Sequence, residues 1–141
     1  MSKRIITISR EFGSGGRTIG KMVAEKLGIA FYDKELIEKI AEETGFSQKF
    51  IEEYGEHAPG TNVFSYSFLG RDANGISMQD KIWMQQRKLI LDLAEKEPCV
   101  IVGRCADYIL RDRTDCLNVF IHASTEKKVE RIVKLYGETA D

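Results

Sequence analysis

The segment that most constrains the fold is a glycine-rich turn near the N-terminus, between an apolar run and a helical pattern. Residues 5–9 read Ile-Ile-Thr-Ile-Ser, which is typical of a strand covered on both faces. The turn follows at residues 11–18, Glu-Phe-Gly-Ser-Gly-Gly-Arg-Thr. From Ile19 to Leu27 apolar residues recur at helical spacing, and Gly28 is a suitable helix stop. The first 28 residues therefore predict a strand, a turn and a helix in succession.

Strands and helices alternate along the rest of the chain. Short β-rich runs at residues 29–32, 99–102 and 117–121 predict three more strands. Helices are expected between and after them, beginning at or near Asp33, Ser47, Ser77, Asp107 and Ser124. This alternation predicts an α/β fold, in which a mostly parallel sheet carries helices on both faces.

Two of the helices carry apolar faces that predict their buried sides. In the helix opened by residues 77–80, this face consists of Ile82, Gln86, Leu89, Ile90 and Leu93, joined by Trp83. In the last helix, the residues expected to face inward are Val129, Ile132, Val133 and Tyr136. Gly137 is expected to end that helix.

Composition predicts one globular domain, residues 1–141, without a broad basic surface. The chain is 43% hydrophobic and 30% charged, and 21 Lys and Arg against 22 Asp and Glu give a formal net charge of −1. A surface for nucleic acid or anionic lipid would need a basic excess, so we expect neither partner. No apolar run approaches the roughly 18–20 residues of a membrane span, and the N-terminus lacks the apolar stretch of a secretory signal.

The cysteines and histidines do not form ligand patterns. Cys99, Cys105 and Cys116 are an odd set without C-x-x-C spacing, which argues against a disulfide framework or a structural zinc site and favours the cytoplasm. His57 and His122 have no ligand-like companions. We therefore expect no metal site built from protein side chains alone.

The glycine-rich turn has the composition of a phosphate-binding loop. Three glycines among four residues let the backbone turn sharply and direct successive N–H groups inward, and the following helix N-terminus adds positive potential. The residues assigned to nucleotide binding are Gly13, Ser14, Gly15, Gly16, Arg17 and Thr18. Arg17 would neutralise phosphate charge, and the Thr18 hydroxyl would contact magnesium.

Two alternatives compete with this assignment. A second register of the same motif runs from Gly15 to Lys21, but it places Met22 where a magnesium-binding hydroxyl is needed. The first register is preferred because it starts directly after the strand and leaves a helix of three turns. The other alternative is a plain glycine-rich turn without a ligand. Glu11 occupies the first glycine position of the motif.

Arg104 is a second candidate, because the buried strand 99–102 ends in Gly103-Arg104. Open α/β sheets bind ligands at the carboxyl ends of their strands. The alternative is a structural ion pair with Asp107 or Asp112.

Residues 56–76 are rich in Gly, Ser and Asn and exceed the usual connection of about 4–6 residues. They predict a long loop within the domain. Such a loop could drive self-association, so a homodimer stays open.

Four blocks of sequence occur in an order that spans nearly the whole chain: ISREFGSGGRTIG, FYDKELI, VIVGRCADYIL and VFIHAS. Taken together, they resemble the cytidylate-kinase-like family within the P-loop nucleoside monophosphate kinase superfamily. The resemblance implies a three-layer P-loop NTPase-like fold with a mostly parallel sheet flanked by helices. It also implies transfer of the γ-phosphoryl group of ATP to a nucleoside monophosphate such as CMP, with Mg²⁺.

The resemblance further implies roles for individual residues. Arg17 and Arg104 would be the catalytic arginines. The residues that would contact the acceptor are Asp33, Lys39, Arg104 and Asp107. Asp107 would substitute for the aspartate that follows Gly-Arg in true cytidylate kinases, where this chain has Cys105. Without the resemblance, Asp33 would be a simple N-cap and Lys39 a solvated helix residue.

Kinases of this type continue past the fourth strand and its helix into an arginine-bearing lid, then another strand and helix. This sequence ends at Asp141, so we expect the lid and the last strand to be absent from it. Whether it is a fragment of a longer protein stays open. Without a lid, the chain could bind phosphate yet turn over slowly. The alternative function is therefore a non-catalytic nucleotide- or phosphate-binding regulatory module.

Overall fold

The computed structural model describes residues 4–33 and 78–137, with the single positions 36, 38, 39, 42, 43, 45 and 75. Four strands form one parallel sheet in the order β2-β3-β1-β4. The strands are β1 (Ile5–Arg10), β2 (Ala30–Tyr32), β3 (Cys99–Val102) and β4 (Cys116–Ile121). The helices are α1 (Gly16–Leu27), α5 (Met78–Lys96), α6 (Ala106–Ile109) and α7 (Thr125–Tyr136).

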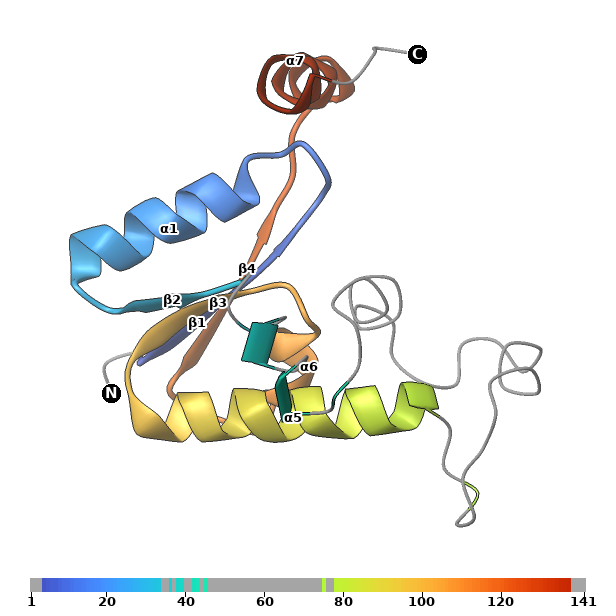
Figure 1. Ribbon diagram of the computed structural model, residues 1–141. Coiled ribbons are helices and arrows are strands. Elements are labelled where there is room, and N and C mark those ends of the chain that lie inside the picture. Colours follow the sequence, from blue (N-terminus) through green and yellow to red (C-terminus); the bar gives the residue numbers. More distant parts are fainter. Residues whose placement is uncertain are drawn as a thin grey trace.

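These elements confirm the predicted alternation, and each predicted strand end lies within one residue of its place in the structure. Nearly all of the predicted loop at 56–76, and the helix expected near Ser47, lie outside the described residues. Helix α1 covers one face of the sheet, and α5 and α6 cover the other (Figure 1). The layered α/β arrangement is therefore the one expected from the sequence.

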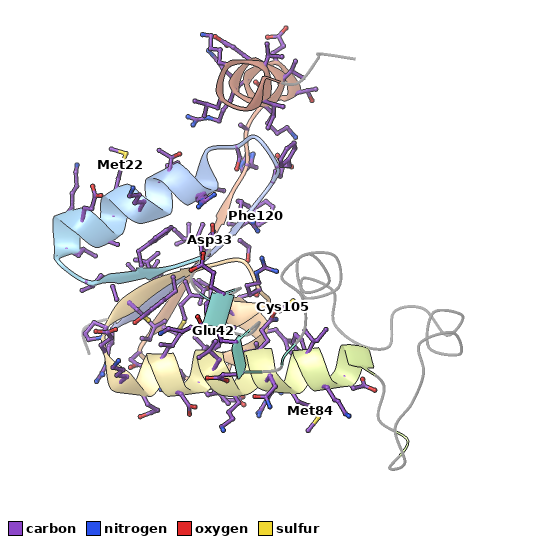
Figure 2. The ribbon with its side chains drawn as sticks, in the orientation of Figure 1. Met22, Asp33, Glu42, Met84, Cys105 and Phe120 are labelled. Carbon is purple, nitrogen blue, oxygen red and sulfur yellow. The ribbon has the colours of Figure 1, made fainter. Side chains whose placement is uncertain are left out.

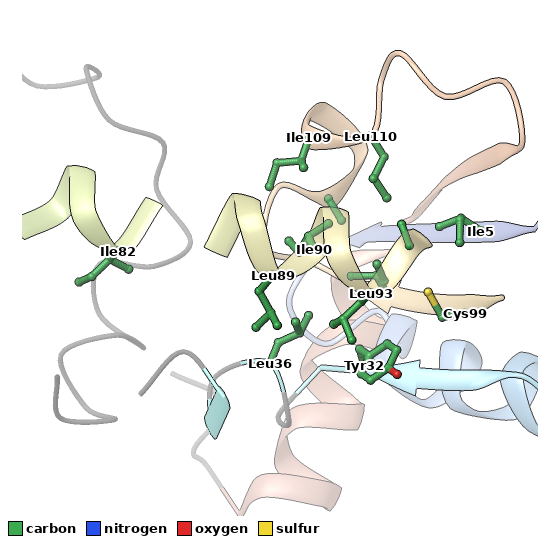
Figure 3. Close-up of a cluster of buried hydrophobic side chains, with 13 residues drawn as sticks. Ile5, Tyr32, Leu36, Ile82, Leu89, Ile90, Leu93, Cys99, Ile109 and Leu110 are labelled. Carbon is green, nitrogen blue, oxygen red and sulfur yellow. The ribbon is translucent and has the colours of Figure 1, made fainter. Parts of the chain in front are cut away.

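Helix α5 supplies most of the core on its side of the sheet. Its predicted face is confirmed, because Ile82, Leu89, Ile90 and Leu93 are all buried, and Trp83 packs against them partly buried. Figure 3 shows Leu89, Ile90 and Leu93 in one cluster with Tyr32 of β2 and Cys99 of β3. Burial raises the pKa of the Cys99 thiol to about 11, so this cysteine is an inert part of the core.

Helix α1 packs on the sheet through small residues rather than through its large apolar ones. Its buried positions are Gly16, Gly20 and Ala24. Three residues of its apolar pattern, Ile19, Met22 and Leu27, are exposed instead. A side chain at Gly20 would meet Ile8 and Val102 of the sheet at 3.0 Å. The helix therefore lies too close to the strands for large side chains, and the apolar spacing indicated the helix but not its buried face.

We expect Gly20→Val to lower the free energy of unfolding by about 1–3 kcal/mol, because the added methyl groups overpack this interface. Lys21→Val is the matched control, since Lys21 is exposed on the same helix. It should cost only the difference in helix propensity, about 0.7 kcal/mol or less. Urea unfolding of both variants measures the two costs, and equal costs would contradict the close packing.

Helix α7 lies beyond the carboxyl ends of β1 and β4 instead of over a face of the sheet (Figure 1). The inward face predicted for it is wrong at two positions: Ile132 is buried, but Val129 and Val133 are exposed. The side chain of Tyr136 is outside the described part of the structure. The predicted helix ends are confirmed, because Ser124 accepts a hydrogen bond from the Lys127 N–H and Gly137 is left-handed.

Within the residues that the structure describes, every helix is too short or too polar to cross a lipid bilayer.

Candidate nucleotide site

The topology of the sheet has a switch point at the carboxyl ends of β1 and β3. These two strands are neighbours, but the chain leaves β1 towards α1 on one face and leaves β3 towards α6 on the other. The loops that follow two such strands diverge, and open α/β sheets bind ligands at this point. The glycine-rich loop follows β1, and the turn that contains Arg104 follows β3. Two segments predicted to bind ligands therefore meet at one place.

The glycine-rich loop keeps most of its backbone donors available. Gly13 and Gly15 have positive φ angles of 79° and 84°, a conformation that glycine adopts without steric cost. The Ser14 N–H donates to the Glu11 carbonyl oxygen at 3.1 Å. Among the described residues, no acceptor is found for the N–H groups of Gly13, Gly15, Gly16, Arg17 and Thr18. Helix N-termini leave such donors to water or to a ligand.

Glu11, which occupies the first glycine position of the motif, joins the loop to α7. Its carboxylate accepts hydrogen bonds from Lys128 Nζ at 3.0 Å and from the Ala123 N–H at 3.3 Å. Its own N–H donates to the Ile121 carbonyl oxygen at 3.0 Å. The Lys128 ammonium group, followed by the Ala123 N–H, lowers the pKa of the Glu11 carboxyl below 4.5. Glu11 thus holds the start of α7 beside the glycine-rich loop.

The contact of Glu11 predicts a pH dependence. The pKa of the Glu11 carboxyl is lower in the folded state than in the unfolded chain. The contact therefore stabilises the fold fully above pH 4.5, and this stabilisation is lost as the pH falls through the folded-state pKa. The midpoint of thermal unfolding should therefore be lower for Glu11→Gln than for the wild type at pH 7, and the gap should close towards pH 3. The exposed Glu25→Gln on α1 is the control for loss of a surface charge. A gap that stays constant with pH would contradict the assignment.

A cavity of about 390 Å³ lies between the loop and α7. Its lining residues include Gly13, Ser14, Lys127, Glu130, Arg131 and Lys134. The Glu130 carboxylate lies 2.8 Å from Lys134 Nζ and 4.0 Å from Lys127 Nζ. The Lys134 ammonium group lowers the pKa of the Glu130 carboxyl. Ser14 is one of the lining residues, but its hydroxyl oxygen is buried and has no partner among the described residues. The cavity therefore has three basic residues in its lining next to the glycine-rich loop, a combination suited to an anion.

Arg131 was not among the residues singled out from the sequence. A Cβ at Gly15 would lie 2.9 Å from the Arg131 guanidinium carbon, so this guanidinium lies directly on the loop. Within the described residues, Arg131 forms no ion pair. A signal was present, because Lys127, Arg131 and Lys134 recur at helical spacing and form a basic stripe. The sequence could not show that this stripe faces the glycine-rich loop, because that depends on where α7 lies in the folded protein.

The structure joins Arg17 to Asp33, which were expected to serve different substrates. Arg17 Nε lies 2.8 Å from Asp33 Oδ2. Asp33 follows β2 and is 8% exposed, whereas the Arg17 side chain is 55% exposed. The ion pair therefore connects the glycine-rich loop with the carboxyl end of β2, where Figure 2 labels Asp33. The roles of Arg17 towards phosphate and of Asp33 towards an acceptor stay predictions.

The remaining predicted residues are placed as follows. Arg104 is 5% exposed and lies just past the end of β3, the neighbour of the strand β1 that leads into the loop. Thr18 is exposed in the first turn of α1. Lys39 Nζ lies 5.4 Å from the centre of the Tyr32 ring. Asp107 is exposed in the first turn of α6. Arg104 and Thr18 thus belong to the segments that follow β3 and β1 at the switch point, whereas the contact found for Lys39 is an aromatic ring.

The donor set suits magnesium that arrives with a nucleotide. Mg²⁺ prefers hard oxygen ligands and is usually held by one or two protein groups together with substrate phosphates. The Thr18 hydroxyl, at the exposed start of α1, provides such a group. In the described part of the chain, no cluster of three or more His, Cys, Asp and Glu side chains could hold a metal ion. The protein groups therefore fit a nucleotide-borne ion.

Comparison with known proteins identifies relatives. The sequence matches the cytidylate kinase-like family over residues 5–141. It is 30% identical over 135 residues to a cytidylate kinase of Archaeoglobus fulgidus, covering 94% of this chain and 62% of that protein. A solved structure of an uncharacterized protein from Eubacterium ventriosum is 30% identical, with a TM-score of 0.65, covering 96% of this chain and 63% of that one. A shikimate kinase from Bacteroides thetaiotaomicron, 22% identical, has a TM-score of 0.55 over 97% of this chain and 70% of its own.

The shikimate kinase confirms the three-layer fold of P-loop kinases, with a mostly parallel sheet between helices. The chain spans 62% of the length of the archaeal cytidylate kinase and 63% of that of the Eubacterium protein. The family match extends from β1 to the last residue. By that match, the chain belongs to the cytidylate kinase-like family.

Proposed function

We propose that the protein is a nucleotide phosphotransferase that moves the γ-phosphoryl group of ATP to a nucleoside monophosphate such as CMP. The observation that carries the proposal is the set of five loop N–H groups, at residues 13 and 15–18, without acceptors in the described structure. Several converging amides can hold a polyphosphate on a protein without a basic surface. The archaeal relative named cytidylate kinase supports the same reaction class.

The donor nucleotide would bind at the glycine-rich loop and the adjoining cavity. The volume of about 390 Å³ falls within the usual range of small-molecule pockets, roughly 300–1,000 Å³. The loop N–H groups would hold the phosphates. Arg131, whose guanidinium lies against the loop, would neutralise phosphate charge. Mg²⁺ bound with the nucleotide and contacted by Thr18 would neutralise charge on the β and γ oxygens.

The acceptor would bind where β2 and β3 end. Arg104 offers a planar fork of donors to the acceptor phosphate, and Asp33 holds Arg17 between the two substrates. An oxygen of the acceptor phosphate forms a bond to the γ phosphorus while the bond from that phosphorus to the β–γ bridging oxygen breaks. ADP leaves, and the acceptor becomes a diphosphate. Positioning and electrostatics carry this reaction, so no covalent protein intermediate is needed.

The test is an assay of the full-length protein with ATP and Mg²⁺ against a panel of nucleoside monophosphates, together with calorimetry of nucleotide binding. We expect ADP to form with at least one acceptor and the corresponding diphosphate to appear in equal amount. ATP binding without transfer to any acceptor would overturn the enzyme proposal in favour of a nucleotide-binding regulatory module. Absence of nucleotide binding would overturn both functions.

A further inference from the structure

A buried glutamine on α5 contacts the turn that carries Arg104. Gln86 lies within the apolar face of α5 and is 0% exposed. Its Nε2 donates a hydrogen bond to the Arg104 carbonyl oxygen at 2.8 Å. A buried amide in apolar surroundings is unfavourable unless it is hydrogen-bonded. This bond is the contact that accounts for the position of the Gln86 side chain.

The turn that receives this bond has an unusual backbone. Gly103, Arg104 and Cys105 are consecutive left-handed residues, with φ angles of 70°, 58° and 55°. Two of them carry side chains, and such conformations persist only where the surrounding structure enforces them. On one side, the Gly103 N–H donates to the Ile8 carbonyl oxygen of β1 at 2.8 Å. On the other side, Gln86 holds the Arg104 carbonyl.

The conformation of this turn determines where Arg104 points. The φ and ψ angles of a residue set the direction of its Cα–Cβ bond. If the Arg104 carbonyl lost its donor, the turn could relax towards the right-handed region, which is more favourable for an L residue. The guanidinium group would then leave its buried place just past the carboxyl end of β3.

Stability alone does not account for a glutamine at this position. Its Oε1 atom is buried without a partner in the described structure. A half-satisfied amide stabilises a core less than an apolar side chain of the same length. The advantage of glutamine over methionine here is the N–H group that faces Arg104.

We propose that Gln86 is a positioning residue that holds the Arg104 turn in its left-handed form and so directs the guanidinium to the acceptor phosphate. The inference rests on the proposed function for the acceptor. The part that does not depend on the proposed function is that Gln86 determines the environment of the Arg104 guanidinium.

The test uses Gln86→Met, which keeps the length of the side chain and removes the donor. Gln85→Met is the matched control, since Gln85 is the adjacent, partly buried residue of the same helix and makes no hydrogen bond within the described residues. We expect Gln86→Met to raise the KM for the acceptor at least about tenfold, the effect of losing one well-placed hydrogen bond. The KM for ATP should stay unchanged, and the thermal midpoint should not fall. In an Arg104→Ala background, Gln86→Met should have no further effect on the acceptor.

A second measurement does not depend on activity. Nitrogen-15 NMR follows the Nε–H resonance of Arg104, which we expect to shift and to exchange faster with solvent in Gln86→Met but not in Gln85→Met. An unchanged Arg104 resonance, or equal changes in the KM of both substrates, would overturn the role of Gln86. If the full-length protein transfers phosphate to no acceptor while the Arg104 resonance shifts as expected, the proposed function alone is overturned.

Discussion

Arg104→Ala is expected to lower kcat/KM for the acceptor nucleotide at least about 100-fold and to leave ATP affinity unchanged. The Arg104 guanidinium is almost fully buried at the end of β3, where it could make two charge-assisted hydrogen bonds to one phosphate. Each such bond contributes about 1.5–3 kcal/mol, and each 1.36 kcal/mol corresponds to a factor of ten. Steady-state kinetics with varied acceptor, and calorimetry with an ATP analogue, measure the two quantities.

Arg111→Ala provides the control for this substitution. Arg111 is exposed after α6, and its guanidinium lies 4.2 Å from the centre of the Tyr108 ring. Its loss removes a cation–π contact of roughly 0.5–1 kcal/mol and should not change the acceptor KM. Similar losses in the two variants would show that the effect is not specific to Arg104. Loss of ATP binding in Arg104→Ala would indicate a disturbed fold instead of a lost acceptor contact.

Gly15→Ala is expected to weaken ATP binding about 10- to 100-fold. Gly15 is the left-handed residue directly before α1, and an added Cβ would lie 2.9 Å from the Arg131 guanidinium carbon. The methyl group would displace Arg131 from the loop and push the backbone away from its left-handed form. A single charge-assisted contact is worth about 1.5–3 kcal/mol, which corresponds to this loss of affinity. Calorimetry with an ATP analogue and Mg²⁺ measures it.

Gly28→Ala is the matched control, because Gly28 is the left-handed residue at the other end of the same helix. A Cβ at Gly28 would meet nothing within 4 Å. Both substitutions carry the strain of a left-handed alanine, on the order of 1 kcal/mol, so both should lower the thermal midpoint. Only Gly15→Ala should weaken nucleotide binding. Equal affinity in the two variants would contradict the placement of the donor phosphates.

The strands and the glycine-rich loop could be predicted because their signals are local. A short β-branched run such as residues 5–9 has few alternatives to a buried strand when a glycine-rich turn and a helix follow it. The capping residue Ser124 and the stop residue Gly137 act on their nearest neighbours. Arg104 could be singled out for the same reason, since it lies just past the end of a buried strand. The family resemblance then supplied the reaction class.

The buried faces of α1 and α7 could not be predicted, because burial depends on what lies opposite. In α1, the sheet is so close that Gly20 faces Ile8 and Val102, while the larger Met22 is exposed (Figure 2). In α7, the helix stands past the end of the strands, so only Ile132 of the described apolar face is buried. Helical periodicity reports that apolar residues share a side, but not which surface they meet.

The contacts that build the site join residues far apart in the sequence. Glu11 looked like a departure from the phosphate-loop motif until α7 placed Lys128 3.0 Å from its carboxylate. Gln86 looked like one polar residue on an apolar face until the turn after β3 brought the Arg104 carbonyl to its amide. Arg131 is separated from Gly15 by most of the chain, yet the two are in contact.

The amino-acid sequence alone specified where this chain turns, where it forms strands and helices, and which loop can expose its backbone donors. Those properties depend on backbone preferences and on neighbours within a few residues. Only the tertiary structure decided which cation lies on the loop, that Arg17 pairs with Asp33, and that Gln86 supports Arg104. The reason is physical: an ion pair or a hydrogen bond needs its two atoms within about 3–4 Å, and folding alone sets that distance for residues remote in sequence.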